Sequence, residues 1–184
     1  VWLEKDGMAT PLQVQGVNWA YRVLEDREGN LWLGTYDQGV YRLIEQTISS
    51  PALPGRPTER YVYPLLEDRS GNVWISAGES GLTRYSNGQF KRFSLPGAKL
   101  PQDISSLYED TDGSLIVGTY LYGLTRFQNG QWSRDAELSA RINERVDVIF
   151  RDRQGDLWFG GRNGLDRRSF AGQWTHYNPD NGLP

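Results

Sequence analysis

Four aspartates spaced 42 residues apart are the first residues that could do chemistry: Asp26, Asp68, Asp110 and Asp152. A ring of carboxylates can ligate a hard cation such as Ca²⁺. Glycine follows each aspartate three residues later, however, which is typical of a type I turn with Asp at its first position. An aspartate there can cap its own turn, and repetition in four copies favours that structural role. We therefore expect no metal site and no cofactor.

His176 is the only histidine, and the chain has no cysteine. A general base needs a partner and a pocket, and we expect neither for a histidine on a predicted outer strand. The lack of cysteine excludes disulfides, thiolate catalysis and Cys-ligated zinc. A pair of carboxylates could still cleave a glycoside, but nothing in the sequence selects such a pair. We predict no catalytic residue in this segment.

The same period of 42 residues predicts the elements that hold these side chains. A large apolar residue follows each aspartate by six positions: Trp32, Trp74, Ile116 and Trp158. Such a period marks stacked copies of one supersecondary unit, whose repeated aromatic residue packs between neighbours. The basic residues beside the turn aspartates, Arg27, Arg69 and Arg153, are expected to be solvated and to make weak surface pairs.

One copy of the repeat can be divided into four strands. The expected strands are Val62 to Glu67, Asn72 to Ser76, Leu82 to Tyr85 and Gln89 to Phe93. Asn87-Gly88, between the last two, is a type I′ hairpin signal. Four strands joined by three tight turns form one propeller blade. Helical signals are nearly absent, and only the segment from Glu137 to Arg145 favours a helical turn.

We predict that residues 1–184 form a partial all-β propeller of four-stranded antiparallel blades. It would contain about four and a half blades of a seven-bladed ring. The expected units are a degenerate or partial blade at 1–17 and blades at 18–59, 60–101, 102–143 and 144–184. Seven units of this length need roughly 290 residues, so we expect this segment to be part of a larger ring. Open sheet edges attract partners, so missing blades, a second propeller or another copy of the chain are expected there.

Composition limits the classes of partner. The net charge is −3 and the basic residues are scattered, which argues against nucleic-acid binding. No apolar run approaches the roughly 18 residues of a membrane span. Hydrophobic residues make up 38% of the chain and aromatic residues 12%, enough for a globular core with repeated aromatic packing.

Two strings carry a family resemblance: residues 24–35 (LEDREGNLWLGT) and 66–75 (LEDRSGNVWI). They resemble the two-component regulator propeller repeat, whose second half is similar to residues 39–42, 81–84 and 123–126. Departures from the repeat are Ile116 for Trp, residues 76–78 for the Gly-Thr pair, and Gly161 for Thr. The resemblance implies a seven-bladed propeller, often one of two in tandem, in the periplasmic sensor half of a bacterial receptor. It also implies attachment to the inner membrane by segments outside these residues, leading to a histidine kinase or diguanylate cyclase.

The candidate ligand-binding residues keep the register of the repeat but change their chemistry. One set lies seven residues before each turn aspartate, and the other lies in the turn between the second and third strands. In an up-and-down blade both sets emerge on one face, so we expect them around one mouth of the central channel. Their aromatic, charged and amide groups suit a polar ligand, although exposed loops also vary without function. The candidates are Trp19, Tyr61, Asp103, Arg145, Tyr36, Asp37, Glu79, Tyr120, Tyr122 and Arg162.

The leading functional hypothesis is a non-catalytic sensor segment that binds a polar small molecule or a saccharide at this mouth. One alternative is a propeller enzyme, a lyase or a glycosidase, which would need a unique acid–base constellation. Another is a protein-interaction scaffold, whose sign would be an exposed aromatic patch formed by Tyr36, Tyr120 and Tyr122.

Overall fold

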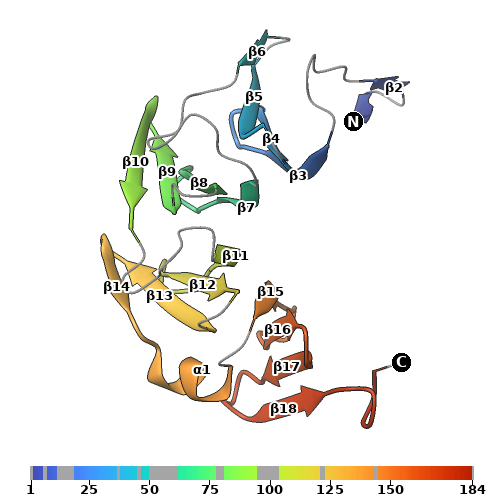
Figure 1. Cartoon of the computed structure of the whole chain (residues 1–184), viewed down its shortest axis with the longest axis vertical. Helices are drawn as coiled ribbons and strands as arrows, with labels where there is room; N and C mark the ends of the chain where they lie inside the picture. Colours follow the sequence, from blue (N-terminus) through green and yellow to red (C-terminus); the bar gives the residue numbers. More distant parts are fainter. Residues whose placement is uncertain are drawn as a thin grey trace.

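The computed structural model describes residues 2–5, 8–11, 19–36, 38–44, 47–49, 62–77, 81–94, 104–120, 123–142 and 145–183. Within these ranges only the backbone of residues 2–5, 8–11, 47, 48, 63 and 77 is described. The chain forms four four-stranded antiparallel sheets that follow one another along an open arc (Figure 1). A two-stranded hairpin of β1 (Trp2–Lys5) and β2 (Met8–Pro11) precedes them.

Each sheet is one blade, with its strands paired in sequence order. Blade 1 contains β3 (Ala20–Glu25), β4 (Leu31–Thr35), β5 (Val40–Ile44) and β6 (Thr47–Ser49). Blade 2 contains β7 (Val62–Glu67), β8 (Val73–Ala77), β9 (Leu82–Ser86) and β10 (Gln89–Phe93). Blade 3 contains β11 (Ile104–Glu109), β12 (Leu115–Thr119), β13 (Leu124–Gln128) and β14 (Gln131–Ser133). Blade 4 contains β15 (Val146–Arg151), β16 (Leu157–Gly161), β17 (Gly164–Arg168) and β18 (Trp174–Tyr177).

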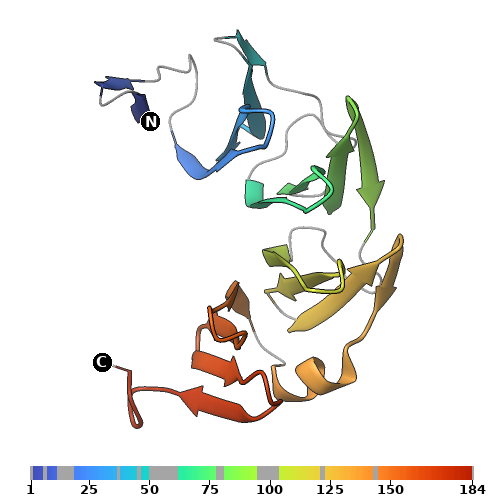
Figure 2. The ribbon, with the colours of Figure 1, turned by 180° about the vertical axis from the view of Figure 1, so that it is seen from behind.

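The blades stand radially. The first strand of each blade lies on the concave side of the arc and the last strand on the convex side, as Figures 1 and 2 show from opposite directions. The predicted all-β propeller with four-stranded antiparallel blades is confirmed. The boundaries of the repeat units and the number of blades in a closed ring stay predictions.

Glycine allows neighbouring first strands to approach the blade before them. A Cβ built on Gly34 of β4 would lie 3.0 Å from Cγ1 of Val62 on β7. Gly118 of β12 is equivalent, and its added Cβ would lie 2.9 Å from the carbonyl oxygen of Val146 on β15. The backbone of one blade therefore packs directly against the first strand of the next, which sets the tight inner radius of the arc.

The core is divided among the blade interfaces. Trp32 and Val40 of blade 1 pack against Val62, Val73 and Ile75 of blade 2. The corresponding interface of blades 2 and 3 contains the buried residues Trp74, Leu82, Ile104, Leu115, Val117 and Phe127. The predicted packing of the repeated tryptophans between blades is confirmed at these two interfaces.

The helix α1 (Ala136–Arg141) lies in the connection between blades 3 and 4, near the predicted helical turn. Asp135 caps it by accepting a hydrogen bond from the Leu138 backbone N–H at 3.1 Å. Leu138 and Ile142 are buried with Val146 and Phe159 of blade 4. A six-residue helix is marginal alone, so this packing is what holds it in place.

The Asn87-Gly88 turn has the backbone that its sequence predicts, with φ of 50° and 78° at the two residues. Replacing Gly88 with alanine is expected to lower the free energy of unfolding by about 1 kcal/mol, because its φ disfavours any Cβ. No neighbouring atom lies within 4 Å of that Cβ, so a steric clash does not contribute. Urea unfolding would measure the loss. Gln89→Ala, on the adjacent strand, is the control and should change stability by less than about 0.5 kcal/mol; equal effects of the two variants would contradict the conformational cause.

Candidate functional site

The repeated aspartates cap their own turns and anchor the tryptophans. In blade 1, Asp26 Oδ1 accepts hydrogen bonds from the backbone N–H groups of Glu28 and Asn30, and Oδ2 accepts one from Trp32 Nε1 at 2.8 Å. Burial raises the pKa of Asp26, but the hydrogen bonds from Trp32 and Asn30 outweigh this and keep its pKa below the ordinary value. The carboxylate is therefore charged and occupied by its own blade, in agreement with the structural interpretation of the repeat.

Arginine completes this arrangement by covering the indole ring. The guanidinium carbons of Arg42, Arg84 and Arg167 lie 5.1, 5.8 and 5.5 Å from the ring centroids of the tryptophans in blades 1, 2 and 4. Trp158 lies opposite Arg167 in the sheet because the β16–β17 turn is one residue shorter than its counterparts. Carboxylate, indole and guanidinium thus form one repeated structural stack.

Blade 3 has Ile116 in place of the tryptophan, and its aspartate takes other partners. Asp110 accepts hydrogen bonds from Arg126 Nη1 at 3.1 Å and from Arg151 Nη2, in blade 4, at 2.7 Å. Arg126 also binds Asp135, the helix cap, at 3.0 Å. The stack of the other blades is replaced here by an ionic cluster that joins blades 3 and 4.

The turn arginines were expected to be solvated residues that make weak surface pairs. All three are exposed, yet Arg27 and Arg69 also join neighbouring turns. The Arg27 backbone N–H donates to Glu67 Oε1 at 3.1 Å, and its Nη1 donates to the Arg69 carbonyl at 2.5 Å. Arg69 repeats this contact with Glu109 of the next blade, at 2.9 Å from its backbone N–H. The expectation was incomplete, because the inter-blade partner comes from another copy of the repeat.

One group of candidate residues gathers at the start of blade 1. The side chain of Trp19 is 65% exposed, and its carbonyl accepts a hydrogen bond from the Tyr36 backbone N–H at 3.2 Å. The Tyr36 ring lies 5.6 Å from the ring of Tyr21, which the repeat comparison did not single out. These three exposed aromatic residues form one surface, called here the aromatic cluster. β3 is exposed at nearly every position, so its burial pattern offers no signal that would have selected Tyr21.

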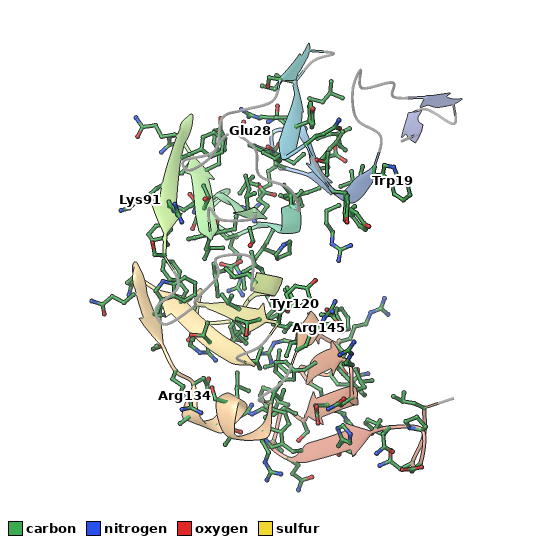
Figure 3. The ribbon with its side chains drawn as sticks, viewed as in Figure 1. Trp19, Glu28, Lys91, Tyr120, Arg134 and Arg145 are labelled. Atoms are coloured by element: carbon green, nitrogen blue, oxygen red, sulfur yellow. The ribbon has the colours of Figure 1, made fainter. Side chains whose placement is uncertain are left out.

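A second group lies between blades 3 and 4. The guanidinium carbon of Arg145 lies 4.1 Å from the ring centroid of Tyr120, and its Nη2 is 3.4 Å from the phenol oxygen. Arg145 Nε also binds Asp147 Oδ1 at 2.5 Å. Figure 3 shows Trp19, Tyr120 and Arg145 along the concave side of the arc, and Lys91 and Arg134 on the convex side. Asp147, two residues after a predicted candidate, was also missed.

The remaining candidates are not brought into either group. Arg162 is exposed in the turn between β16 and β17. Among the residues that the structure describes, no hydrogen bond or ring contact joins the aromatic cluster to the Arg145–Tyr120 pair. Their convergence on one ligand mouth therefore stays a prediction. Five candidates lie outside the described residues: Tyr61, Asp103, Asp37, Glu79 and Tyr122.

The prediction that His176 has neither a partner nor a pocket is wrong. His176 lies opposite Asp166 in the β17–β18 pair, and its Nδ1 is 2.8 Å from Asp166 Oδ1. Both residues line a pocket of about 330 Å³ on the flank of blade 4, beside α1. The sequence concealed this pair because it is formed across two strands. We call this hollow the flank pocket; besides these two residues it is lined by Arg141, Ile142, Arg145, Val146, Phe159, Gly160, Gly161, Asn163, Gly164, Trp174 and Thr175.

The described part of the chain contains no group of three or more His, Asp or Glu side chains placed to hold a metal ion. No helix among the described residues is both long and apolar enough to cross a membrane.

The comparison with protein families finds the two-component regulator propeller model at residues 15–37 and 141–163. The two matched segments lie three repeat lengths apart, so they fall on the same part of two blades. No curated protein matches the chain.

The solved structures that resemble this chain are propellers of several functions. The extracellular domain assigned to a hybrid two-component system of B. thetaiotaomicron superposes with a TM-score of 0.79 at 19% identity, covering 98% of this chain and 26% of that one. Virginiamycin B lyase of Staphylococcus aureus superposes with a TM-score of 0.68 at 16% identity, covering 93% and 59%. A gluconolactonase of Xanthomonas campestris gives 0.60 at 14% identity, covering 87% and 62%. This chain spans about a quarter of the first of these structures, and identities this low show a shared fold alone.

Proposed function

Because this chain carries two-component regulator propeller repeats, we propose that it is a non-catalytic, ligand-sensing part of a bacterial membrane receptor. Its ligand is a polar small molecule or a saccharide, bound at the mouth of the channel. The receptor places the propeller outside the cytoplasm, in the periplasm or at the cell surface, and a kinase or cyclase elsewhere in the protein gives the output. The extracellular domain that resembles this chain supports the location.

The observation that carries the proposal is the chemistry of the two groups on the concave side. Residues that serve the architecture repeat in blade after blade, as the aspartate–tryptophan–arginine stack does. Trp19 and Arg145 occupy one repeat position, which holds a different residue in every blade, and Tyr36 and Tyr120 occupy another, which holds Gly78 and Arg162 in blades 2 and 4. The exposed rings of Trp19 and Tyr36 can stack on a ligand, and the Arg145 guanidinium beside the half-buried Tyr120 can bind its polar groups, which is the usual composition of a small-molecule site.

The partners proposed for the chain are further blades, a second propeller of the same receptor, or a second copy. The free face of blade 4 supports an added blade. Phe150 on β15 is 57% exposed, whereas Leu24, Leu66 and Tyr108 occupy the same repeat position and are partly buried against the following blade. An exposed apolar residue at this position is suited to packing by another β-sheet.

Two alternatives have some support. The lyase and the lactonase among the similar structures are enzymes, but their identity to this chain is too low to carry an activity. His176, which contacts a carboxylate as a general base would, lies on the outermost strand of blade 4 and not on the concave side. The aromatic cluster on blade 1 would also serve a protein-interaction scaffold.

The test replaces Trp19, Tyr36, Tyr120 and Arg145 with alanine in the intact receptor, one at a time and together. We expect the combined variant to need at least about tenfold more ligand for half-maximal output, since each lost stack or charged contact weakens binding by roughly 0.5–2 kcal/mol. Lys91→Ala and Arg134→Ala, on the convex side, are the controls. A full response by the combined variant would exclude this mouth as the sensing site, and loss of response in the controls would show that folding is the cause.

A further inference from the structure

Blade 4 departs from the other blades at several places, and the departures meet in the flank pocket. The register that holds Asp166 and His176 in blade 4 holds Thr83 and Arg92 in blade 2. An acid and a base thus replace a hydroxyl and a cation at the corresponding pair. Because the pair of Asp166 and His176 differs from the corresponding pair of blade 2, the repeated architecture does not require it.

Blade 4 also differs from blades 1 and 3 at the last residue of its second strand, β16. In blades 1 and 3 the position belongs to Thr35 and Thr119, whose hydroxyls bind the carbonyls of Gly39 at 2.8 Å and Gly123 at 3.0 Å and so close the turn. In blade 4 it belongs to Gly161, and the turn is one residue shorter. An added Cβ on Gly161 would clash with the Arg145 carbonyl oxygen, so the backbone of the two segments packs closely there, and Gly161 lines the pocket.

The charge of the flank pocket favours an anion. Its lining contains two guanidinium groups, Arg141 and Arg145, and one carboxylate, Asp166. Arg145 is paired with Asp147, so Arg141 is the cation that the pocket offers to a ligand. The carboxylate is already bound to His176 Nδ1. A guanidinium group such as that of Arg141 binds a carboxylate with two parallel hydrogen bonds.

The other walls supply a ring and a hydrogen-bonding imidazole. Trp174 stacks on Phe159 with a centroid separation of 5.8 Å, and its indole N–H donates to Glu137 at 3.2 Å, so the ring is held from two sides. When Nδ1–H of His176 donates to Asp166, the neutral imidazole keeps Nε2 as an acceptor for a ligand hydroxyl or amine. The volume of about 330 Å³ is near the lower end for small-molecule pockets, which limits the ligand to the size of one sugar or one amino acid.

We propose that the flank pocket is a second binding site, which takes a small carboxylate-bearing polar molecule. Arg141 binds the carboxylate, His176 binds a hydroxyl or amine through Nε2, and Trp174 covers the face of the ligand. This site goes beyond the mouth described above. Arg145 lines both, whereas Arg141 lines only the flank pocket, so a variant of Arg141 separates the two proposals.

The experiment uses His176 as its own reporter. Because the chain has one histidine, the imidazole Hε1 proton gives a single NMR signal that needs no assignment. Glucuronate, glutamate and glucose would be titrated into the full chain up to about 50 mM, far above the ~1 mM Kd of a weak specific ligand. We expect a saturable shift of this signal with at least one carboxylate and none with glucose. Tighter binding of glucuronate assigns the site to acidic sugars, and tighter binding of glutamate assigns it to amino acids.

The variant Arg141→Gln should weaken carboxylate binding by about tenfold or more, since the charged partner is lost. Arg134→Gln removes an exposed arginine on the convex side and should leave binding unchanged. The Hε1 signal and the thermal midpoint of each free variant show whether it is folded. The proposal is overturned if neither carboxylate gives a saturable shift, if glucose binds as well as the carboxylates, or if folded Arg141→Gln binds like the native chain.

Discussion

Replacing Trp32 with alanine is expected to lower the free energy of unfolding by about 3–5 kcal/mol, the usual loss for a buried tryptophan. The side chain has no exposed surface and packs against the next blade, with its ring 5.0 Å from that of Tyr85. The substitution leaves a cavity between two blades and removes the indole N–H that Asp26 accepts. It also removes the ring beneath Arg42. Urea unfolding followed by circular dichroism would measure the loss.

The matched control for this prediction is Trp19→Ala. Trp19 is the same residue type in the same blade, but it is largely exposed. Its loss should change stability by less than about 0.5 kcal/mol, the usual range for surface substitutions. A change below about 1 kcal/mol for Trp32→Ala would mean that the blade interfaces are not the main source of stability.

Replacing Asp110 with asparagine is expected to lower the free energy of unfolding by about 2–3 kcal/mol, because two arginines lose a charged acceptor. Asp110 is buried, and it binds Arg126 of its own blade and Arg151 of blade 4. Asparagine keeps the size of the side chain, so the variant isolates the charge. Glu28→Gln, which removes the charge of an exposed ion pair with Arg42, is the control and should cost at most about 1 kcal/mol.

The pH dependence of the free energy of unfolding, compared between the native chain and Asp110→Asn, provides a second measurement. Burial raises the pKa of Asp110, but hydrogen bonds from the Thr111 backbone, Arg126 and Arg151 outweigh burial and leave it below the ordinary value of 3.8. A lowered folded-state pKa contributes stability above the unfolded-state value, and this contribution disappears as pH falls through the folded-state pKa. The stability difference between the native chain and Asp110→Asn should therefore be constant near neutral pH and shrink below about pH 4. A difference that stays constant into acid would contradict the ionic role of Asp110.

Local features of the fold could be predicted because each depends on a few neighbouring residues. The strands β7 and β10 match their predicted bounds, β9 ends one residue later than predicted, and β8 begins and ends one residue later than predicted. The alternation of apolar and polar residues, the turn glycines and the Asn87-Gly88 hairpin signal each lie within a short stretch of chain. The repeat then placed the same elements in the other blades.

Contacts between copies could not be predicted, because a period states which residues are equivalent and not which ones meet. Asp166 and His176 face each other only through the pairing of β17 with β18. The ionic cluster forms because Ile116 replaces the tryptophan that bonds the equivalent aspartate in the other blades, and because Arg151 of the next blade binds Asp110 instead. The repeat predicted that Arg145 and Tyr120 lie on one face of the propeller. Their direct contact could not be predicted, because it depends on how closely blades 3 and 4 pack.

The charges at the junction between blades 3 and 4 also affect the order in which similar blades can pack during folding. At the two earlier junctions the cation belongs to the leading blade and the acid to the following one, as with Arg27 and Glu67. At the third, Thr111 replaces the arginine and Arg151 replaces the glutamate, so the polarity is reversed. A blade 4 that skipped a place and docked on blade 1 or 2 would bring Arg151 against Arg27 or Arg69, with like charges in contact. The reversed pair therefore disfavours docking of blade 4 on blade 1 or 2, because Arg151 would meet an arginine where blade 3 has Thr111.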